Sequence, residues 1–233
     1  MATNMNNIKP AVLIVFRDEE DILEQTLDHW RRLGIEKFYL CDNLSTDSSP
    51  EIAKKYTDDL RWHPGTDWPG PKIINQLKNE ALNNGYNWIF PIDADEQICL
   101  PPEYADIYEY ISSLNVPDDE YACCEVKYLN ILPDGRASMN EPQRKVFGKL
   151  SPIWRIEVGN HYIINQQPTI DGRGAYYKHY HIRSLKQFTN KMKNWMVAIH
   201  QRGWDHPHNE HYHRWQREGD MYITNLYHQL TMV

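Results

Sequence analysis

Short hydrophobic runs alternate with amphipathic stretches along the first part of the chain. Most of the runs are rich in β-branched and aromatic residues, which favours strands that are buried on both faces. Between the runs, apolar residues recur every three or four positions, a spacing that predicts helices with one buried face. This order predicts an α/β fold, in which helices flank a mostly parallel sheet. Strands are predicted over 11–16, 38–41, 60–63 and 88–92, and helices over Leu23–Trp30, from Pro50 and from Pro71.

The pattern changes after Leu100. The segments that follow indicate an antiparallel extension of the sheet and, further on, C-terminal helical structure. Ser184 and Gln187 form a capping-box pattern, and apolar residues then follow helical spacing as far as Gly203. A short helix is predicted over 104–114, strands over 121–129 and 145–147, and a mixed segment over 154–164.

These patterns predict one domain over residues 10–203. Residues 1–9 are polar and rich in Asn, and we expect them to be flexible. Residues 204–233 form a His- and aromatic-rich extension, for which a solvated tail is the simplest expectation.

Composition excludes several classes of protein. The formal net charge of -7 argues against binding to nucleic acid. No apolar run approaches the roughly 20 residues of a spanning helix, so we expect no stable membrane insertion. The four cysteines lack metal-ligand spacing, which is typical of reduced thiols and of a cytoplasmic location. Residues 178–217, in contrast, hold eight Lys or Arg against two acids, which indicates contact with an anion. The oligomeric state stays open.

The candidate chemistry centres on Asp93-Ala94-Asp95, which ends the hydrophobic run 88–92. On an extended segment the two carboxylates would leave on the same side and repel each other unless a cation lay between them. A hard divalent ion, Mn²⁺ or Mg²⁺, is the natural partner, and it commonly completes its shell with phosphate oxygens. Arg17 and the pair Asp42-Asn43 end two other predicted strands. Because ligands bind beyond the carboxyl ends of parallel strands, these groups predict a metal and phosphate site.

Several motifs, in the same order along the chain, resemble the family-2-like glycosyltransferases with the GT-A (Rossmann-like) fold. The resemblance extends from about residue 10 to 195. It is to the branch of this family in which a strand ends in an aspartate-x-aspartate-glutamate motif. Gln97 departs from that branch, which often has an aromatic residue there. The matching residues are Phe16–Asp21, Trp30, Leu33–Ile35, Asp42–Asp47, Gln76, Trp88–Glu96, His179-Tyr180, Arg183-Ser184, Phe188 and Lys191.

The resemblance implies roles for four of these residues. Asp42 would lie near the nucleotide base or ribose, and Asp93 near the ribose and the metal. Asp95 would ligate the metal that holds the diphosphate, and His179 would complete the metal shell or touch the diphosphate.

The resemblance also implies a substrate class. Residues 10–100 would bind a nucleotide-diphospho-sugar donor, and residues 101–203 a glycan or lipid-linked glycan acceptor. The activity would be that of a hexosyltransferase, with inversion as the expected stereochemistry.

Such a transfer needs cations for the departing diphosphate and a carboxylate base for the acceptor hydroxyl. Lys145, Arg183, Lys186 and Lys191 are the candidate cations, although each is equally compatible with a solvated surface. Glu157 is the first candidate base, Asp171 the second and Glu96 a third, and His161 could orient a substrate. Each of these residues has an ordinary structural alternative.

Two other classes of function remain open. A nucleotidyltransferase acting on a sugar phosphate would use similar carboxylates, but it usually carries a Gly- and Lys/Arg-rich loop where this chain has Arg17-Asp18-Glu19-Glu20. A non-catalytic carbohydrate-binding protein is the other alternative, against which the intact Asp93 and Asp95 count.

Overall fold

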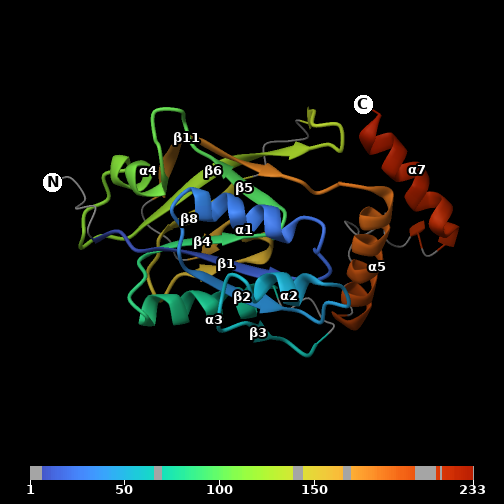
Figure 1. Ribbon diagram of the computed structural model, residues 1–233, viewed down its shortest axis with the longest axis horizontal. Coiled ribbons are helices and arrows are strands. Elements are labelled where there is room, and N and C mark those ends of the chain that lie inside the picture. The colour runs from blue at the N-terminus through green and yellow to red at the C-terminus, as the bar shows by residue number, and fades with distance from the viewer. Residues whose placement is uncertain are drawn as a thin grey trace.

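A nine-stranded sheet runs through the centre of the part of the chain that the computed structural model describes, residues 7–65, 70–138, 144–164, 169–202, 214–215 and 217–232 (Figure 1). Its strand order is β3-β2-β1-β4-β8-β6-β11-β5, with β7 paired to β6. The first four strands in this order are parallel to one another, and antiparallel pairs begin where β4 meets β8. The prediction of an α/β fold with a parallel sheet and an antiparallel extension is therefore confirmed.

The parallel half has the order 3-2-1-4 of a Rossmann-like sheet, which reverses direction between β1 and β4. All residues of β1, β2 and β4 are buried, in agreement with their continuous apolar sequences. The strands of this half are β1 (Pro10–Phe16), β2 (Phe38–Asp42), β3 (Arg61–Trp62) and β4 (Trp88–Ile92), and its helices are α1 (Leu23–Arg32), α2 (Ser49–Ala53) and α3 (Gly70–Asn83).

The other half of the sheet combines antiparallel and parallel pairs. Its strands are β5 (Glu96–Cys99), β6 (Ala122–Ile131), β7 (Ala137–Ser138), β8 (Arg144–Lys149) and β11 (Thr169–His179). A separate pair, β9 (Arg155–Ile156) and β10 (Ile163–Ile164), encloses the short 3-10 helix η2 (Val158–Asn160). Further helices in the described residues are α4 (Ile107–Ser113), α5 (Leu185–Arg202) and α7 (Asp220–Thr231).

Alternation along β1 divides the core into two layers. Val12, Ile14 and Phe16 face the layer that contains α1 and α4, whereas Leu13 and Val15 face the layer that contains α3. Helices therefore cover both faces of the sheet, and the carboxyl ends of β1 and β4 are the part of the parallel half left for a ligand.

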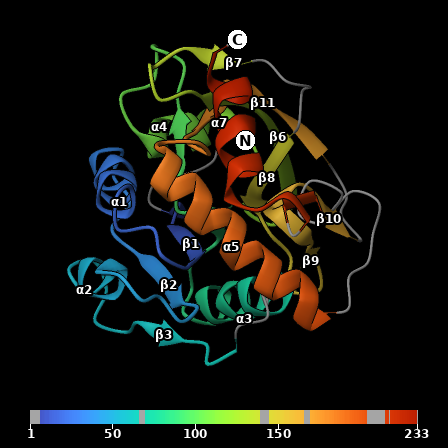
Figure 2. The ribbon, with the colours of Figure 1, turned by 90° about the vertical axis from the view of Figure 1, so that its right-hand side faces the viewer.

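Helix α5 lies across these carboxyl ends, and α7 lies beside α5 on its outer side (Figure 2). The predicted cap of α5 is present, since Gln187 N donates to Ser184 Oγ at 3.1 Å. Ile223 of α7 packs against Phe188 and Met192 of α5. No helix in the described ranges is long and apolar enough to cross a lipid bilayer.

The hydrophobic pattern of the sequence does not predict two of the elements. Strand β11 has a polar sequence interrupted by Gly172 and Gly174, so it lacks the apolar run that marks a buried strand. Helix α7 falls inside the extension expected to be a solvated tail, yet it has a buried residue, Ile223, and packs on α5. The histidines expected in that tail, His206, His208, His211 and His213, lie outside the described residues, as do residues 1–6 of the expected flexible N-terminus.

Candidate functional site

A pocket with about 910 Å³ of free space opens at the carboxyl ends of β1 and β4, beneath α5. This is the point where the strand order of the sheet reverses, which is where open α/β sheets bind their ligands. The strand ends contribute Arg17, Glu19, Asn43, Asp93 and Asp95, and α5 contributes Gln187, Lys191, Asn194 and Trp195. The clustering predicted from the strand ends is thus present in the structure.

The segment from Asp93 to Glu96 is a turn, and the premise that it is extended is wrong. Glu96 N donates to the carbonyl of Asp93 at 3.1 Å, and Asp93 N donates to the Glu96 carboxylate at 2.9 Å. These two bonds close the turn and send Asp93 and Asp95 to different partners. Repulsion between the two carboxylates is therefore relieved by separation as well as by cations.

Lys145 is the partner of Asp93 and Glu96. Its buried ammonium lies 2.8 Å from Asp93 Oδ2, 2.7 Å from Glu96 Oε1 and 2.5 Å from the carbonyl oxygen of Gly159. The contacts with Asp93 and Gly159 are hydrogen bonds, and the contact with Glu96 is an ion pair. Although burial opposes the charged form, the carboxylates of Asp93 and Glu96 outweigh it and raise the pKa of Lys145. Lys145 therefore holds the turn through its contacts with Asp93 and Glu96.

Asp95 is almost completely buried, with an exposed fraction of 1%. Its Oδ2 lies 2.7 Å from Lys191 Nζ and 3.3 Å from Arg183 Nη1, both from the C-terminal part of the chain. Burial alone would raise the pKa of Asp95, but Lys191, His179 and Arg183 outweigh it and hold this pKa well below its ordinary value. Asp95 is therefore a carboxylate anion within a cationic shell.

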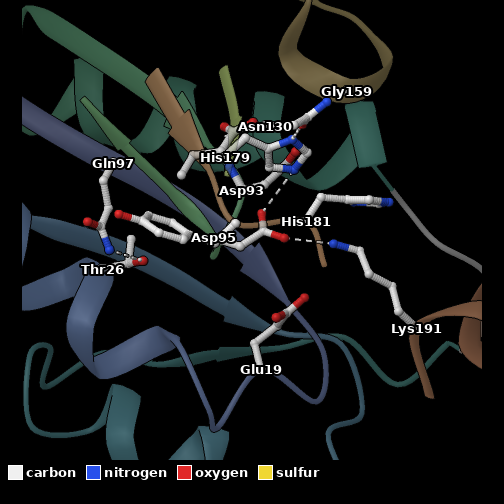
Figure 3. A network of polar contacts seen from close by, with 12 residues as sticks. Glu19, Thr26, Asp93, Asp95, Gln97, Asn130, Gly159, His179, His181 and Lys191 are labelled. Carbon is white, nitrogen blue, oxygen red and sulfur yellow. Dashed lines mark hydrogen bonds and ion pairs between the residues drawn. The ribbon is translucent and has the colours of Figure 1, made fainter. Parts of the chain in front are cut away.

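The other oxygen of Asp95, Oδ1, is buried without a hydrogen-bond partner. His179 Nε2 faces it at 3.4 Å, and the ring of His181 lies beside that of His179 (Figure 3). On the far side of the His179 ring, Nδ1 lies 2.8 Å from Asn130 Oδ1. An amide oxygen only accepts, so this contact places the proton of neutral His179 on Nδ1 and leaves a lone pair on Nε2.

Asp95, His179 and His181 together suit a divalent metal ion. One potential ligand atom from each lies within 4.8 Å of the other two. The unpartnered buried oxygen of Asp95 and the free lone pair of His179 are the features that such an ion would satisfy. Asp93, which the sequence placed with Asp95 as a metal ligand, is instead turned toward Lys145.

Arg183 joins α5 to the loop after β1. It donates to the carboxylates of Glu19 and Asp21 in addition to its contact with Asp95. Burial raises the pKa of Glu19 to about 7 despite the opposing charges of Lys191 and Arg183. The loop, the turn and α5 are thus connected by one network of charges.

Asn43 is the second group in the pocket without a partner. Its exposed fraction is 1%, and neither its amide nitrogen nor its amide oxygen makes a hydrogen bond within the described structure. The preceding residue, Asp42, is also buried, and its Oδ1 accepts from Ser45 N at 3.0 Å. Asp42 therefore shapes the loop after β2, while Asn43 presents an unused donor and acceptor.

Other predicted residues lie at varying distance from this pocket. Glu157 borders a small adjoining pocket together with Asp93 and Asn160. His161 Nδ1 lies 2.7 Å from the carbonyl oxygen of Arg144, and Lys186 lines a neighbouring surface pocket. Asp171 is not brought to the site, because its β6 partner Glu125 lies five residues from Asn130, the partner of His179, a span of about 17 Å along a strand.

Comparisons with known proteins give only distant likenesses. No protein-family model matches the chain, and neither does any curated protein. Among solved structures, TarS of S. aureus aligns with a TM-score of 0.40 and 18% identity, over 58% of this chain and 23% of its own. TarS residues 1–349 in complex with UDP-GlcNAc give the same score and identity, over 58% of this chain and 37% of that one. The inositol-1-phosphate CTP transferase of T. maritima aligns with a TM-score of 0.41 and 11% identity, over 85% and 98%. Such values assign no activity to the chain.

The residues of the site that were not among its predicted members include His181, Glu19 and Asn130. His181 could have been found from its spacing, because it lies two positions after His179 and leaves an extended segment on the same side. Glu19 stood in the polar cluster after the first strand, but nothing in that cluster indicated that it would be buried. Asn130 carries no signal in the sequence, since its role arises from the pairing of β6 with β11.

Proposed function

We propose that this protein is a metal-dependent glycosyltransferase that moves a sugar from a nucleotide-diphospho-sugar to a hydroxyl of a glycan or lipid-linked glycan. The observation that carries the proposal is that two buried polar groups in one pocket lack a hydrogen-bond partner. The free oxygen of Asp95 suits a metal, and the free amide of Asn43 suits a nucleobase edge. The ordered motifs described above support the same reading.

The nucleotide would lie along the ends of β1 and β2. The Asn43 amide offers one donor and one acceptor, a combination that matches the paired groups on the edge of a nucleobase. Arg17 lines the same pocket and is close enough to add a cation near the ribose or phosphates. Binding would remove the cost of leaving the buried amide unpaired.

The diphosphate would lie between the turn after β4 and α5. A divalent ion held by Asp95, His179 and His181 would act as a Lewis acid and template for the departing diphosphate. Lys191 and Arg183 border the same carboxylate and supply fixed positive charge to the leaving group. Because α5 covers the pocket, water is partly excluded and these charges act in a medium of low polarity.

Glu157 would accept the proton of the attacking hydroxyl. Its carboxylate is 18% exposed and lies in the small pocket that also reaches Asp93 and Gly159. A base on the opposite side of the sugar from the diphosphate leads to inversion at the anomeric carbon, which is the stereochemistry we propose. Trp195, at the α5 side of the main pocket, offers an aromatic face to a sugar.

A two-stage assay tests this function. Thermal unfolding of the full chain is first measured with UDP, GDP or CDP, each with and without Mn²⁺, and one diphosphate is expected to raise the Tm in the presence of the ion. The matching nucleotide sugars are then supplied with glycan acceptors, and release of the nucleoside diphosphate is followed. Failure of every nucleotide to raise the Tm would contradict the proposal. Release of pyrophosphate from a nucleoside triphosphate and a sugar phosphate would replace it with nucleotidyl transfer.

A further inference from the structure

We propose that His181 is a third protein ligand of the metal and that, with His179, it makes the site select Mn²⁺, Co²⁺ or Zn²⁺ over Mg²⁺. The sequence alone left Mn²⁺ and Mg²⁺ equally open. This inference rests on the proposed function for its place in catalysis, but the metal site can be tested without any substrate.

The first step is the direction of the two imidazoles. His179 is the last residue of β11, and His181 follows it two positions later, where the chain is still without helix or turn. Side chains two apart on such a segment leave on the same side. The ring centroids lie 5.2 Å apart, the rings lie side by side (Figure 3), and one nitrogen of each lies within 4.8 Å of an Asp95 carboxylate oxygen.

The second step is the state of the three ligand atoms. Asp95 Oδ1 has no hydrogen-bond partner, and the contact with Asn130 leaves a lone pair on Nε2 of His179. Within the described residues the His181 ring makes no hydrogen bond either. Asp95 Oδ1 and His179 Nε2 therefore converge as two acceptors, and the acceptor nitrogen of neutral His181 is a third potential ligand beside them. Two buried acceptors without a donor cost free energy unless a cation lies between them.

The third step is the separation of roles on Asp95. Lys191 and Arg183 occupy the side of Oδ2, whereas the His179 imidazole faces Oδ1. A metal at Oδ1 therefore does not require either cation to leave. Asp93 is turned toward Lys145 and Asn160, and within the described residues it does not belong to the group of converging ligand atoms.

The fourth step is the choice of ion. A set of two imidazoles and one carboxylate is rich in nitrogen. Imidazole suits Zn²⁺ and Fe²⁺, and the affinity of such a site for transition ions rises from Mn²⁺ through Fe²⁺ to Co²⁺. Mg²⁺ prefers oxygen ligands, gives up its water reluctantly and gains little from imidazole. With Asp93 removed from the ligand set, the site has a single carboxylate and lacks the oxygen-rich character that Mg²⁺ needs.

Binding of Mn²⁺ to the full chain, followed by the loss of the electron paramagnetic resonance signal of the free ion, tests the inference. We expect His181→Ala to weaken Mn²⁺ binding at least about tenfold, since even outer residues of metal sites contribute tenfold or more. The exposed His228 on α7 provides the matched control, and His228→Ala is expected to bind Mn²⁺ as the unmodified chain does. A 100-fold excess of Mg²⁺ should leave the bound Mn²⁺ in place.

A second variant guards against a general loss of structure. His181→Asp replaces an imidazole with a carboxylate, so it should keep the site while shifting its preference toward Mg²⁺, and Mg²⁺ should then displace Mn²⁺. The inference is overturned if His181→Ala binds Mn²⁺ with unchanged affinity, or if His181→Asp and the unmodified chain have the same Mg²⁺ to Mn²⁺ preference. Intact Mn²⁺ binding through His181 without turnover of any nucleotide sugar would instead refute the proposed function and leave the metal site standing.

Discussion

Lys191 Nζ lies 2.7 Å from Asp95 Oδ2 and so ties α5 to the turn after β4. The two residues lie 96 positions apart in the sequence, and both line the pocket at the carboxyl ends of β1 and β4. Arg183 adds a second cation to the same oxygen. The charge on Asp95 thus serves both the proposed metal and the placement of α5.

Replacement of Asp95 should therefore abolish most of the activity. Asp95→Asn retains the shape of the side chain but removes the charge that the metal, Lys191 and Arg183 share. We expect turnover of the nucleotide sugar to fall by about 100- to 1,000-fold, the usual loss when a principal electrostatic group of an active site is removed. Initial rates at saturating Mn²⁺ measure the effect, with the exposed Glu51→Gln as control. Unchanged turnover would remove Asp95 from the active site.

Loss of Lys145 should destabilise the fold. Lys145→Met leaves the carboxylates of Asp93 and Glu96 without their cation, and removal of one partner of a buried ion pair costs about 3–5 kcal/mol. Urea unfolding measures this free energy. The double variant Lys145→Met/Glu96→Gln removes the fully buried negative charge as well, so it should recover part of the loss. Equal stability of the single and double variants would contradict the pairing.

Asn43 should show opposite effects on stability and binding. Its amide is buried without a partner, so Asn43→Leu is expected to stabilise the ligand-free chain by about 1–3 kcal/mol. The same variant should lose the rise in Tm that a nucleoside diphosphate causes in the unmodified chain. Urea unfolding and thermal shifts are the two measurements. A variant that is less stable, or that keeps the full thermal shift, would show that the amide does not serve the nucleotide.

Glu19 should make stability depend on pH. Burial raises its pKa from 4.5 to about 7, so the folded chain binds more protons than the unfolded chain between these values. The contribution of Glu19 to stability is therefore present below pH 4.5 and is lost as the pH rises to about 7. Glu19→Gln, which does not ionise, should lack this loss and gain stability relative to the unmodified chain over that range. Unfolding free energies at several pH values test this, with the exposed Glu103→Gln as control.

The elements that the sequence predicts best are those whose signal is local. The apolar runs of β1, β2 and β4 identify buried strands, and their order is sufficient to place Arg17, Asn43 and Asp95 at one edge of the sheet. Strand β11, in contrast, is partly exposed and irregular. Its sequence is polar and contains Gly172 and Gly174, so no hydrophobic periodicity predicts it.

The contacts within the site depend on partners that are distant in the sequence. The pairing of Asp93 with Lys145 joins residues 52 positions apart, and no local pattern distinguishes Lys145 from a surface cation. The turn at 93–96 likewise depends on a bond from the Asp93 backbone to the Glu96 side chain, which the spacing of the acids does not reveal. The resemblance to glycosyltransferases directed attention to Asp95 and His179, but the partner of each became visible only in three dimensions.

The irregularity in β11 has a consequence for how the chain tolerates changes of length. Between Asp171 and Tyr176 the register of β11 against β6 shifts by three residues, and beyond the shift His179 lies opposite Asn130. Insertion or deletion of a single residue in Gly172-Arg173-Gly174 that moved the end of β11 by one position would exchange the two faces of that segment and direct His179 away from Asp95. The length of this distant glycine-containing segment thus determines which face of β11 carries the proposed metal ligand His179.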